Sequence, residues 1–295
     1  MRIAFLGLGA IGRPMAARLA RQHSLTLWNR TSERAEALAR ETGTRAAASP
    51  RAAVERAEAV FTCLPTSAEV ESLLDGPEGV LAGISRGALM VDCTSGDPLV
   101  SRRIADRLTS LGVAFVDAPV SGGTDGAARG TLTVMVGGTA EAFGRARPLL
   151  EALGQRIEHL GPVGTGHAMK AVNNALLAVN ILAFGEGMLA LVKAGIPARK
   201  AVEVLNASSG RSFVSERLVP ERVLTGDWPR TFRLALLEKD VAIAVRFLEN
   251  VNLGSPILHL ASELLRVARA ALGEEADYLE AIRLQEEEAG AEIRG

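Results

Sequence analysis

The stretch GTGHAMKAVNNALL carries the residues of this chain that are best suited to move a proton. It contains Lys170, one of only four lysines against 29 arginines, so this sequence uses arginine almost wherever it needs a surface cation. On a helix, Lys170 and Asn174 share a face about one turn apart. A lysine partly desolvated by apolar neighbours can donate or accept a proton near neutral pH, which arginine cannot do. On local sequence alone, a lysine that reaches solvent from the start of a helix is an equally good alternative.

Two neighbours of Lys170 are weaker candidates. Asn173 would point about 100° away from Asn174 on a helix, so we expect it to lie outside the same cleft. His167 precedes Lys170 by three residues, and structural packing is its expected role. The four histidines are scattered without ligand spacing, which argues against a metal site.

The sequence GLGAIG matches the G-x-G-x-x-G pattern of dinucleotide-binding loops and directly follows an apolar run, RIAFL, that is typical of a strand. Gly7 would make the tight turn, Gly9 would let a pyrophosphate approach the backbone, and Gly12 would let helix and strand pack closely. The N–H groups at the start of the next helix would face the anion. The pattern predicts a cofactor loop made of Gly7, Leu8, Gly9, Ala10, Ile11 and Gly12.

The residues after the second predicted strand, LTLW, indicate which dinucleotide binds. A cofactor without a 2′-phosphate usually meets an acidic residue about 20 residues beyond the glycines. Here Asn29, Arg30 and Thr31 stand instead. Arg30 can pair with a 2′-phosphate and Thr31 can donate to it, although Thr31 or Ser32 can also cap the following helix. We therefore predict NADP as the preferred cofactor, with NAD possible.

Further polar and small residues follow later strands. Leu64 and Pro65 come after AVFTC, and Ser95 comes after ALMVD. In an open α/β sheet, ligands lie beyond the carboxyl ends of the strands. We expect these three residues beside the nicotinamide half of the cofactor.

The heptapeptide DAPVSGG ends another strand pattern, VAFV. Ser121, Gly122 and Gly123 can present a hydroxyl and closely spaced N–H groups with little side chain in the way. That combination suits a small carboxylate. A plain turn is the alternative.

The elements that must position these residues fall into two groups. Up to residue 162, apolar strand patterns alternate with amphipathic helical ones, which predicts a parallel sheet in a doubly wound, Rossmann-type dinucleotide-binding domain (1–162). From residue 163 the pattern is helical throughout, which predicts an all-α domain for substrate binding and oligomerisation (163–295), joined by one long helix. The charged last residues are expected to form a solvated, frayed tail.

Composition narrows the function further. A length of 295 residues suits two domains with their own cores, and a net charge of −1 offers no basic excess for nucleic acid. No uninterrupted apolar run reaches the length of a membrane span and no charged leader precedes the first strand, so we expect a cytoplasmic protein without a membrane partner. Cys63 and Cys93 lack metal or redox-pair spacing and are expected to be buried free thiols.

The predicted helices of the second half are long and apolar, with little polar alternation. One way to bury them is against a second subunit, so we expect a homodimer or homotetramer. A monomer in sedimentation equilibrium at micromolar concentration would contradict this expectation.

Four segments in order, FLGLGAIGRPM, DAPVSGG, GTGHAMKAVNN and EKDVAIA, resemble the β-hydroxyacid dehydrogenases, and specifically their 3-hydroxyisobutyrate dehydrogenase branch. The resemblance runs from Arg2 to about Leu272. It implies hydride transfer between NAD(P) and a small β-hydroxyacid, most closely 3-hydroxyisobutyrate giving methylmalonate semialdehyde in valine catabolism. Lys170 corresponds to the general acid/base, which takes the proton of the substrate hydroxyl as hydride leaves.

The same resemblance implies roles for other residues. Ser121, Gly122 and Gly123 correspond to the loop that holds the substrate carboxylate, and Asn174 corresponds to its helix partner. Lys239 corresponds to a second lysine that closes over cofactor and substrate.

Several alternatives stay open. NRT after the second strand is typical of NADPH-dependent glyoxylate and succinic semialdehyde reductases, whereas NASSGRS (206–212) resembles the 3-hydroxyisobutyrate enzymes. A non-catalytic NADP-binding scaffold or sensor and an imine reductase are both disfavoured by Lys170 together with the SGG loop. Ile11 stands where the family usually has Met, a modest packing change. Arg211, Phe213 and Phe232 are candidates to shape the substrate pocket.

Overall fold

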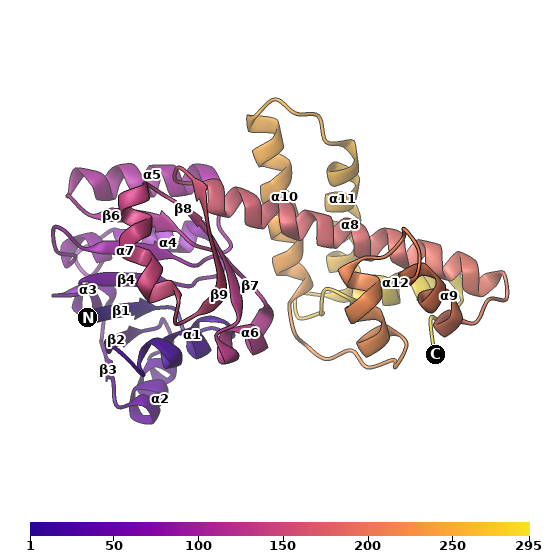
Figure 1. Cartoon of the computed structure of the whole chain (residues 1–295), viewed down its shortest axis with the longest axis horizontal. Helices are drawn as coiled ribbons and strands as arrows, with labels where there is room; N and C mark the ends of the chain where they lie inside the picture. The colour runs from indigo at the N-terminus through magenta and orange to yellow at the C-terminus, as the bar shows by residue number, and fades with distance from the viewer. The chain divides into compact units, whose positions relative to one another are not determined.

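The computed structural model describes all 295 residues, which divide into two compact units, Met1–Lys170 and Ala171–Gly295. The first unit holds one sheet (Figure 1). Its strands are β1 (Arg2–Leu6), β2 (Ser24–Trp28), β3 (Arg45–Ala46), β4 (Ala59–Thr62), β5 (Leu89–Asp92), β6 (Ala114–Asp117), β7 (Val120–Ser121), β8 (Leu132–Gly137) and β9 (Gly154–Gly161).

The order of the strands is that of a doubly wound dinucleotide-binding fold. It runs β3-β2-β1-β4-β5-β6-β8-β7, with β9 beside β8. The strands from β3 to β6 are parallel, and β8 is antiparallel to β6 and β7. β4 and β5 are buried along their whole length, as parallel strands covered on both faces should be. The predicted Rossmann-type α/β fold is confirmed.

Helices cover both faces of this sheet because its strands are apolar on both sides. Along β1, Ile3 and Phe5 join one buried cluster, whereas Ala4 and Leu6 join another. Alternate residues of a strand point to opposite faces, so the two clusters are the two sides of the sheet. The helices of this unit are α1 (Gly12–Leu19), α2 (Ser32–Thr42), α3 (Pro50–Val54), α4 (Ser67–Leu74), the 3-10 turn η1 (Val80–Ala82), α5 (Pro98–Ser110), α6 (Gly123–Arg129) and α7 (Ala140–Leu150).

Three strands were not predicted from the sequence. β3 and β7 have two residues each, too few for a periodic signal. β9 is mostly exposed and carries the charged residues Arg156 and Glu158, so it lacks the apolar run expected of an inner strand.

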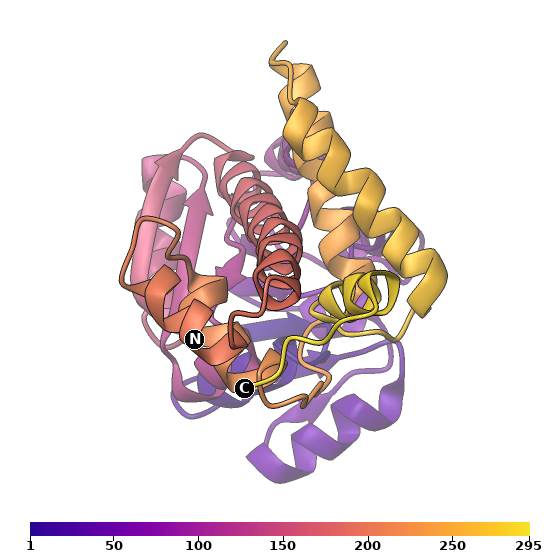
Figure 2. The same ribbon diagram turned by 90° about the vertical axis from the view of Figure 1, so that its right-hand side faces the viewer.

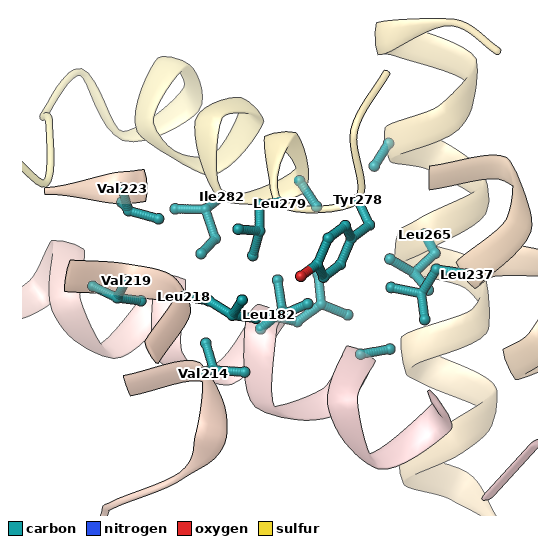
Figure 3. Packing of buried hydrophobic residues seen from close by; sticks show 14 of the residues in the cluster. Leu182, Val214, Leu218, Val219, Val223, Leu237, Leu265, Tyr278, Leu279 and Ile282 are labelled. Carbon is teal, nitrogen blue, oxygen red and sulfur yellow. The ribbon is translucent and has the colours of Figure 1, made fainter. Parts of the chain in front are cut away.

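The second unit is helical, and its helices form one buried core. Figure 3 shows this core with side chains from several helices, among them Leu182, Leu218, Leu237 and Leu265, around the ring of Tyr278. α10 and α11 lie side by side (Figure 2). The helices are α8 (Thr165–Lys193), which begins in the first unit, and α9 (Ala198–Asn206), the π-helix η2 (Val214–Val223), α10 (Leu234–Asn250), α11 (Pro256–Leu272) and α12 (Glu280–Ala289).

The C-terminal residues are part of this core. Ile293 is fully buried, and its N–H donates to Glu286 Oε1 at 2.7 Å. Arg294 pairs with the same carboxylate at 2.7 Å. The expectation of a frayed tail was wrong, because one apolar residue and one ion pair anchor this largely charged segment.

α8 is a single 29-residue helix and is mostly apolar (Figure 1). By length and composition alone it could cross a membrane, with a mean hydropathy of 2.0 over an 18-residue window. The statement that no stretch reaches such a length therefore needs correction. Buried helices of soluble proteins pass the same test, and Ala175, Ala178 and Ile181 of α8 are buried in the core of the second unit.

α11 keeps an apolar stripe on its outer side. Ile257, Leu260 and Val267 are 66%, 61% and 50% exposed, while Ala261 and Leu265 of the same helix are buried. The spacing places the exposed residues on one face. Contiguous exposed apolar surface marks interaction sites, which agrees with the expected oligomer without testing it.

One buried ion pair braces the second unit. Arg222 Nη2 lies 2.7 Å from Asp277 Oδ1, and both side chains are almost fully buried. The other carboxylate oxygen of Asp277 accepts from the N–H groups of Thr231 and Phe232. Arg222 also lies over the ring of Tyr278. The pair thus joins η2 to the segments that precede α10 and α12.

Replacing Asp277 with Ala should lower the free energy of unfolding by about 3–5 kcal/mol, because a buried guanidinium would lose its partner. Guanidinium chloride unfolding followed by circular dichroism measures the change. Glu263→Ala is the matched control, since its ion pair with Arg266 is exposed on both sides and should change little. Equal effects of the two substitutions would contradict this account.

The two thiols lie at the ends of neighbouring strands. Thr62 of β4 pairs in register with Asp92 of β5, so Cys63 and Cys93 follow side by side. Cys93 is buried and Cys63 partly so, and no disulfide joins them. Burial, and secondarily the charge of Asp92, raise the pKa of the Cys63 thiol to about 12. Burial and the neighbouring Cys63 raise the pKa of Cys93 as well.

The native thiols should therefore resist iodoacetamide at pH 8.5, reacting about a thousandfold or more slowly than in the urea-unfolded chain, because only the thiolate attacks. Unfolded thiols ionise near their ordinary pKa, whereas the native ones stay protonated. The free energy of unfolding should thus fall as pH rises from about 9 toward 12. Rapid labelling of both thiols in the native protein would show that they are not enclosed.

Candidate active site

The glycine loop has the geometry that its spacing predicts. Gly7 has a φ of +100°, and a Cβ there would lie 2.4 Å from the carbonyl oxygen of Cys63. Its N–H donates to the carbonyl of Trp28 at 2.9 Å, which continues the ladder between β1 and β2. At Gly12 a Cβ would lie 2.1 Å from the carbonyl oxygen of Gly7. Both positions exclude any side chain.

Gly9 differs from these two, and its surroundings fit a bound dinucleotide. It is exposed, and a Cβ built on it meets no protein atom within 4 Å. The space beside it is therefore open, as the approach of a pyrophosphate requires. Ala10 is exposed, and Ile11 is the N-cap of α1. The Arg13 N–H donates to the Gly9 carbonyl at 3.0 Å, whereas the N–H of Gly12, the first residue of α1, has no acceptor inside the helix. This loop can hold the phosphates of the cofactor.

Asn29 has a structural task that the sequence did not reveal. Its Oδ1 accepts from the N–H of Leu8 at 2.9 Å, and its Nδ2 donates to the carbonyl of Thr31 at 3.0 Å. It thereby links the glycine loop to the end of β2. In the sequence, Asn29 was notable only because it stands where an acidic residue would favour NAD.

The residues next to Asn29 are accessible. The Arg30 side chain is 87% exposed and lies 4.0 Å from Glu69. Thr31 is the N-cap of α2, but its side chain makes no capping hydrogen bond. Ser32 is the first residue of the helix, and its hydroxyl lies 3.5 Å from the carboxylate of Glu33. The alternative that either hydroxyl caps α2 is therefore wrong.

The carboxyl ends of four strands form one row. Leu6, Thr62, Asp92 and Asp117 are register partners in turn. Immediately beyond this row, the N–H of Leu64 donates to the hydroxyl of Thr94 at 3.1 Å. Pro65 is exposed and Ser95 is half-buried. The expected nicotinamide-side residues thus lie along the same edge of the sheet as the glycine loop.

The SGG loop is open and largely free of side chains. Ser121 ends β7 and pairs with Thr133 of β8. Gly122 and Gly123 both have positive φ, +132° and +67°, and a Cβ on Gly123 would meet nothing within 4 Å. Such consecutive left-handed residues favour glycine. The loop leads directly into α6, and its backbone is accessible to a small anion.

Lys170 lies in the second turn of α8 and is half-buried. The start of this helix is fixed to the sheet. The carboxylate of Asp117, the last residue of β6, accepts from the N–H groups of Gly164 and His167 at 2.7 and 2.8 Å. α8 therefore begins at the edge of the sheet at which the glycine loop also lies.

In the second unit, Asn174 and Lys239 meet at a residue that sequence reasoning missed. Asp240 is buried; its Oδ2 accepts from Asn174 Nδ2 at 2.6 Å, and its Oδ1 lies 2.9 Å from Lys239 Nζ. Its only signal in the sequence was its place beside Lys239. Asn173 donates to Asn174 Oδ1 at 3.1 Å and so supports the Asn174 amide.

The residues suggested for substrate shape are dispersed. Phe213 is 61% exposed and Arg211 pairs with Glu216 at 3.5 Å on the surface. Phe232 packs edge-on against Tyr278. Within NASSGRS, Asn206 donates to the carbonyl of Ser215 at 3.0 Å, which stabilises the turn between α9 and η2.

In the comparison with known proteins, two families match consecutive parts of the chain. Residues 2–161 match the NAD binding domain of 6-phosphogluconate dehydrogenase. Residues 164–285 match the family described as NAD-binding of NADP-dependent 3-hydroxyisobutyrate dehydrogenase.

Relatives cover nearly the whole chain. A 2-(hydroxymethyl)glutarate dehydrogenase of Eubacterium barkeri is 33% identical over all of this chain and 98% of its own. An NAD-dependent L-serine dehydrogenase of Pseudomonas aeruginosa is 38% identical over 90% of this chain and 91% of its own. The structure of Mycobacterium tuberculosis 3-hydroxyisobutyrate dehydrogenase with L-serine is 30% identical and superimposes with a TM-score of 0.89, covering 96% of this chain and 98% of that one.

The family matches and the full-length relatives indicate the same kind of enzyme as the glycine loop and the lysine-bearing helix. The chain belongs to the β-hydroxyacid dehydrogenase family and is an NAD(P)-dependent oxidoreductase.

Proposed function

We propose that this dehydrogenase oxidises the primary alcohol of 2-substituted 3-hydroxypropanoates, with 3-hydroxyisobutyrate giving methylmalonate semialdehyde as the first candidate reaction. The observation that carries the proposal is the place of Lys170. It stands on a helix whose start is bound to the carboxyl end of β6, the edge of the sheet that also carries the glycine loop. An amine at this edge can exchange a proton with a substrate hydroxyl.

The substrate class follows from what the relatives act on. L-Serine, 3-hydroxyisobutyrate and 2-(hydroxymethyl)glutarate all contain the unit HOCH2–CH(R)–COO⁻. They differ only in R, which is an amino, a methyl or a carboxyethyl group. A site built for the shared unit needs one group for the hydroxyl and one for the carboxylate, and R decides between family members.

The residues of this chain supply both groups. Lys170 Nζ would take the hydroxyl proton during oxidation and return it during reduction. The N–H groups and hydroxyl of Ser121, Gly122 and Gly123 would hold the carboxylate, in an open loop that leaves them accessible. When bound, the nicotinamide cofactor supplies the chemistry of hydride acceptance and donation.

In this proposal, Asp240 orients the side chains of Asn174 and Lys239. Asp240 contacts both other side chains, at 2.6 and 2.9 Å, and so fixes the orientation of the Asn174 amide and of the Lys239 ammonium. Oriented polar groups cost no reorganisation when substrate binds. The family assignment makes the chain an enzyme, so a non-catalytic scaffold or sensor is not retained.

A panel of substrates tests the proposal. With NAD⁺ and NADP⁺, the purified protein should reduce the cofactor with 3-hydroxyisobutyrate, L-serine or 2-(hydroxymethyl)glutarate, read as absorbance at 340 nm. At saturation, one of the three should give a turnover of roughly 1 s⁻¹ or more. Reduction of glyoxylate or succinic semialdehyde by NADPH, with all three acids inert, would instead support the alternative reductase.

We also propose that NADP is the preferred cofactor. No carboxylate ends β2, and Asn29 occupies that place with both ends of its amide engaged. Arg30 is exposed and held only by a 4.0 Å contact with Glu69, a weak interaction that a phosphate can replace. The Thr31 hydroxyl makes no capping bond and can donate to the same phosphate.

Arg30→Ala should weaken NADP binding about tenfold or more, the loss expected for a hydrogen bond to a charged group. NAD affinity should stay unchanged, because NAD has no 2′-phosphate. Titration of the intrinsic tryptophan fluorescence measures both. Arg40→Ala, at the other end of α2, is the control for a general change of charge. An equal loss for both cofactors would refute a phosphate contact at Arg30.

A further inference from the structure

The first turn of α8 carries a buried histidine that the proposed reaction does not use. His167 is fully buried, and its Nδ1 lies 2.6 Å from the hydroxyl of Ser101 on α5. Its Nε2 faces Asp92 Oδ2, the carboxylate at the end of β5, across 4.0 Å. Neither of these last two atoms has a hydrogen-bond partner. The Ser101–His167 hydrogen bond is therefore buried and joins α5 to α8, while Asp92 lies beside the ring without a hydrogen bond to it.

The hydroxyl of Ser101 determines which nitrogen of His167 carries a proton. Ser101 Oγ donates its own hydrogen to the carbonyl of Asp97 at 3.0 Å. It can then only accept from His167, so Nδ1 is a donor. Asp92 Oδ1 already accepts from the Thr62 hydroxyl and the Thr94 N–H, which leaves Oδ2 as a buried acceptor.

The backbone around this histidine is equally restrained. The N–H of His167 donates to Asp117 at 2.8 Å. At Gly166 a Cβ would lie 2.3 Å from the carbonyl oxygen of Met135 on β8, so the helix presses against the sheet there. At Gly96 a Cβ would lie 2.6 Å from the His167 ring. The ring thus fits between the loop before α5 and the edge of the sheet.

These contacts fix both the rotation and the depth of the first helical turn. Lys170 follows His167 by three residues, so the two are neighbours on the helix surface. Any rotation of this turn would displace the base of the Lys170 side chain. A displacement of about 1 Å at a reacting group can cost about 100-fold in rate.

We propose that His167 is a positioning residue for Lys170, held by Ser101 through its ring and by Asp117 through its backbone. The proposal rests on the proton-transfer role of Lys170 given above. His167 does not touch the substrate; it acts by holding the amine in register with the edge of the sheet.

A double-mutant cycle tests this role. In the wild-type background, His167→Leu should lower kcat about 100-fold, and His167→Asn should lower it less, because the Asn amide can still donate to Ser101. The affinity for NADP, titrated by tryptophan fluorescence, should stay within the error of the wild-type value. In the Lys170→Ala background, the same His167 substitutions should leave the residual rate unchanged.

Two further variants serve as a second probe of the contact and as a control. Ser101→Ala removes the acceptor of Nδ1 without touching α8, and it should show the same dependence on Lys170 if His167→Leu does not fold. His159→Asn is the control, since His159 lies on β9, stacked on Phe143, outside this chain of contacts. It should leave kcat unchanged in both backgrounds.

The outcomes separate the two claims. Equal losses from the His167 and Ser101 variants with and without Lys170 would mean that they act only on stability, and would overturn the positioning role. An unimpaired Lys170→Ala enzyme would instead overturn the proton-transfer role on which it rests.

Discussion

The structure of this enzyme depends on how the buried carboxylate of Asp117, at the end of its sheet, is hydrogen-bonded. Asp92 and Asp117 are the last residues of β5 and β6, and both are fully buried. A buried carboxylate is costly unless donors surround it. For Asp117 these donors are the N–H of Gly164, just before α8, and the N–H of His167 in its first turn. N–H groups at the start of a helix have no acceptor within the helix. The carboxylate gains donors and the N–H groups gain an acceptor. This contact determines where α8 begins.

This contact places Lys170 at the edge of the sheet that also carries the glycine loop. The glycine loop lies at the same edge because β1 and β4 run parallel to β5 and β6. Its glycines are required for different reasons. Gly7 and Gly12 exclude a side chain by contact with protein atoms, whereas Gly9 leaves open space for the cofactor. The lysine and the phosphate loop are thus placed by one edge of the sheet.

Much of this was readable in the sequence, because the signals were local. Runs such as AVFTC and ALMVD are apolar on both faces, and their alternation with helical patterns favours a parallel sheet that is covered on both sides. The glycine pattern and the lysine-bearing helix follow from spacing alone. The exposed strand β9, the buried Ile293 and the role of Asn29 were missed, since each depends on a partner distant in the chain. Asp240 was also missed. Its distant partner is Asn174, and in the sequence a carboxylate beside a lysine looks like an ordinary surface ion pair.

The central claim is that the amine of Lys170 moves the proton. Chemical rescue tests it most directly: Lys170→Ala is assayed at pH 9 with the acid that the wild-type enzyme turns over, while methylamine is added at constant ionic strength. The account predicts that the oxidation rate rises in proportion to the free amine, and that the wild-type rate does not. A folded variant that binds cofactor normally, remains slow and does not respond to amine would contradict it.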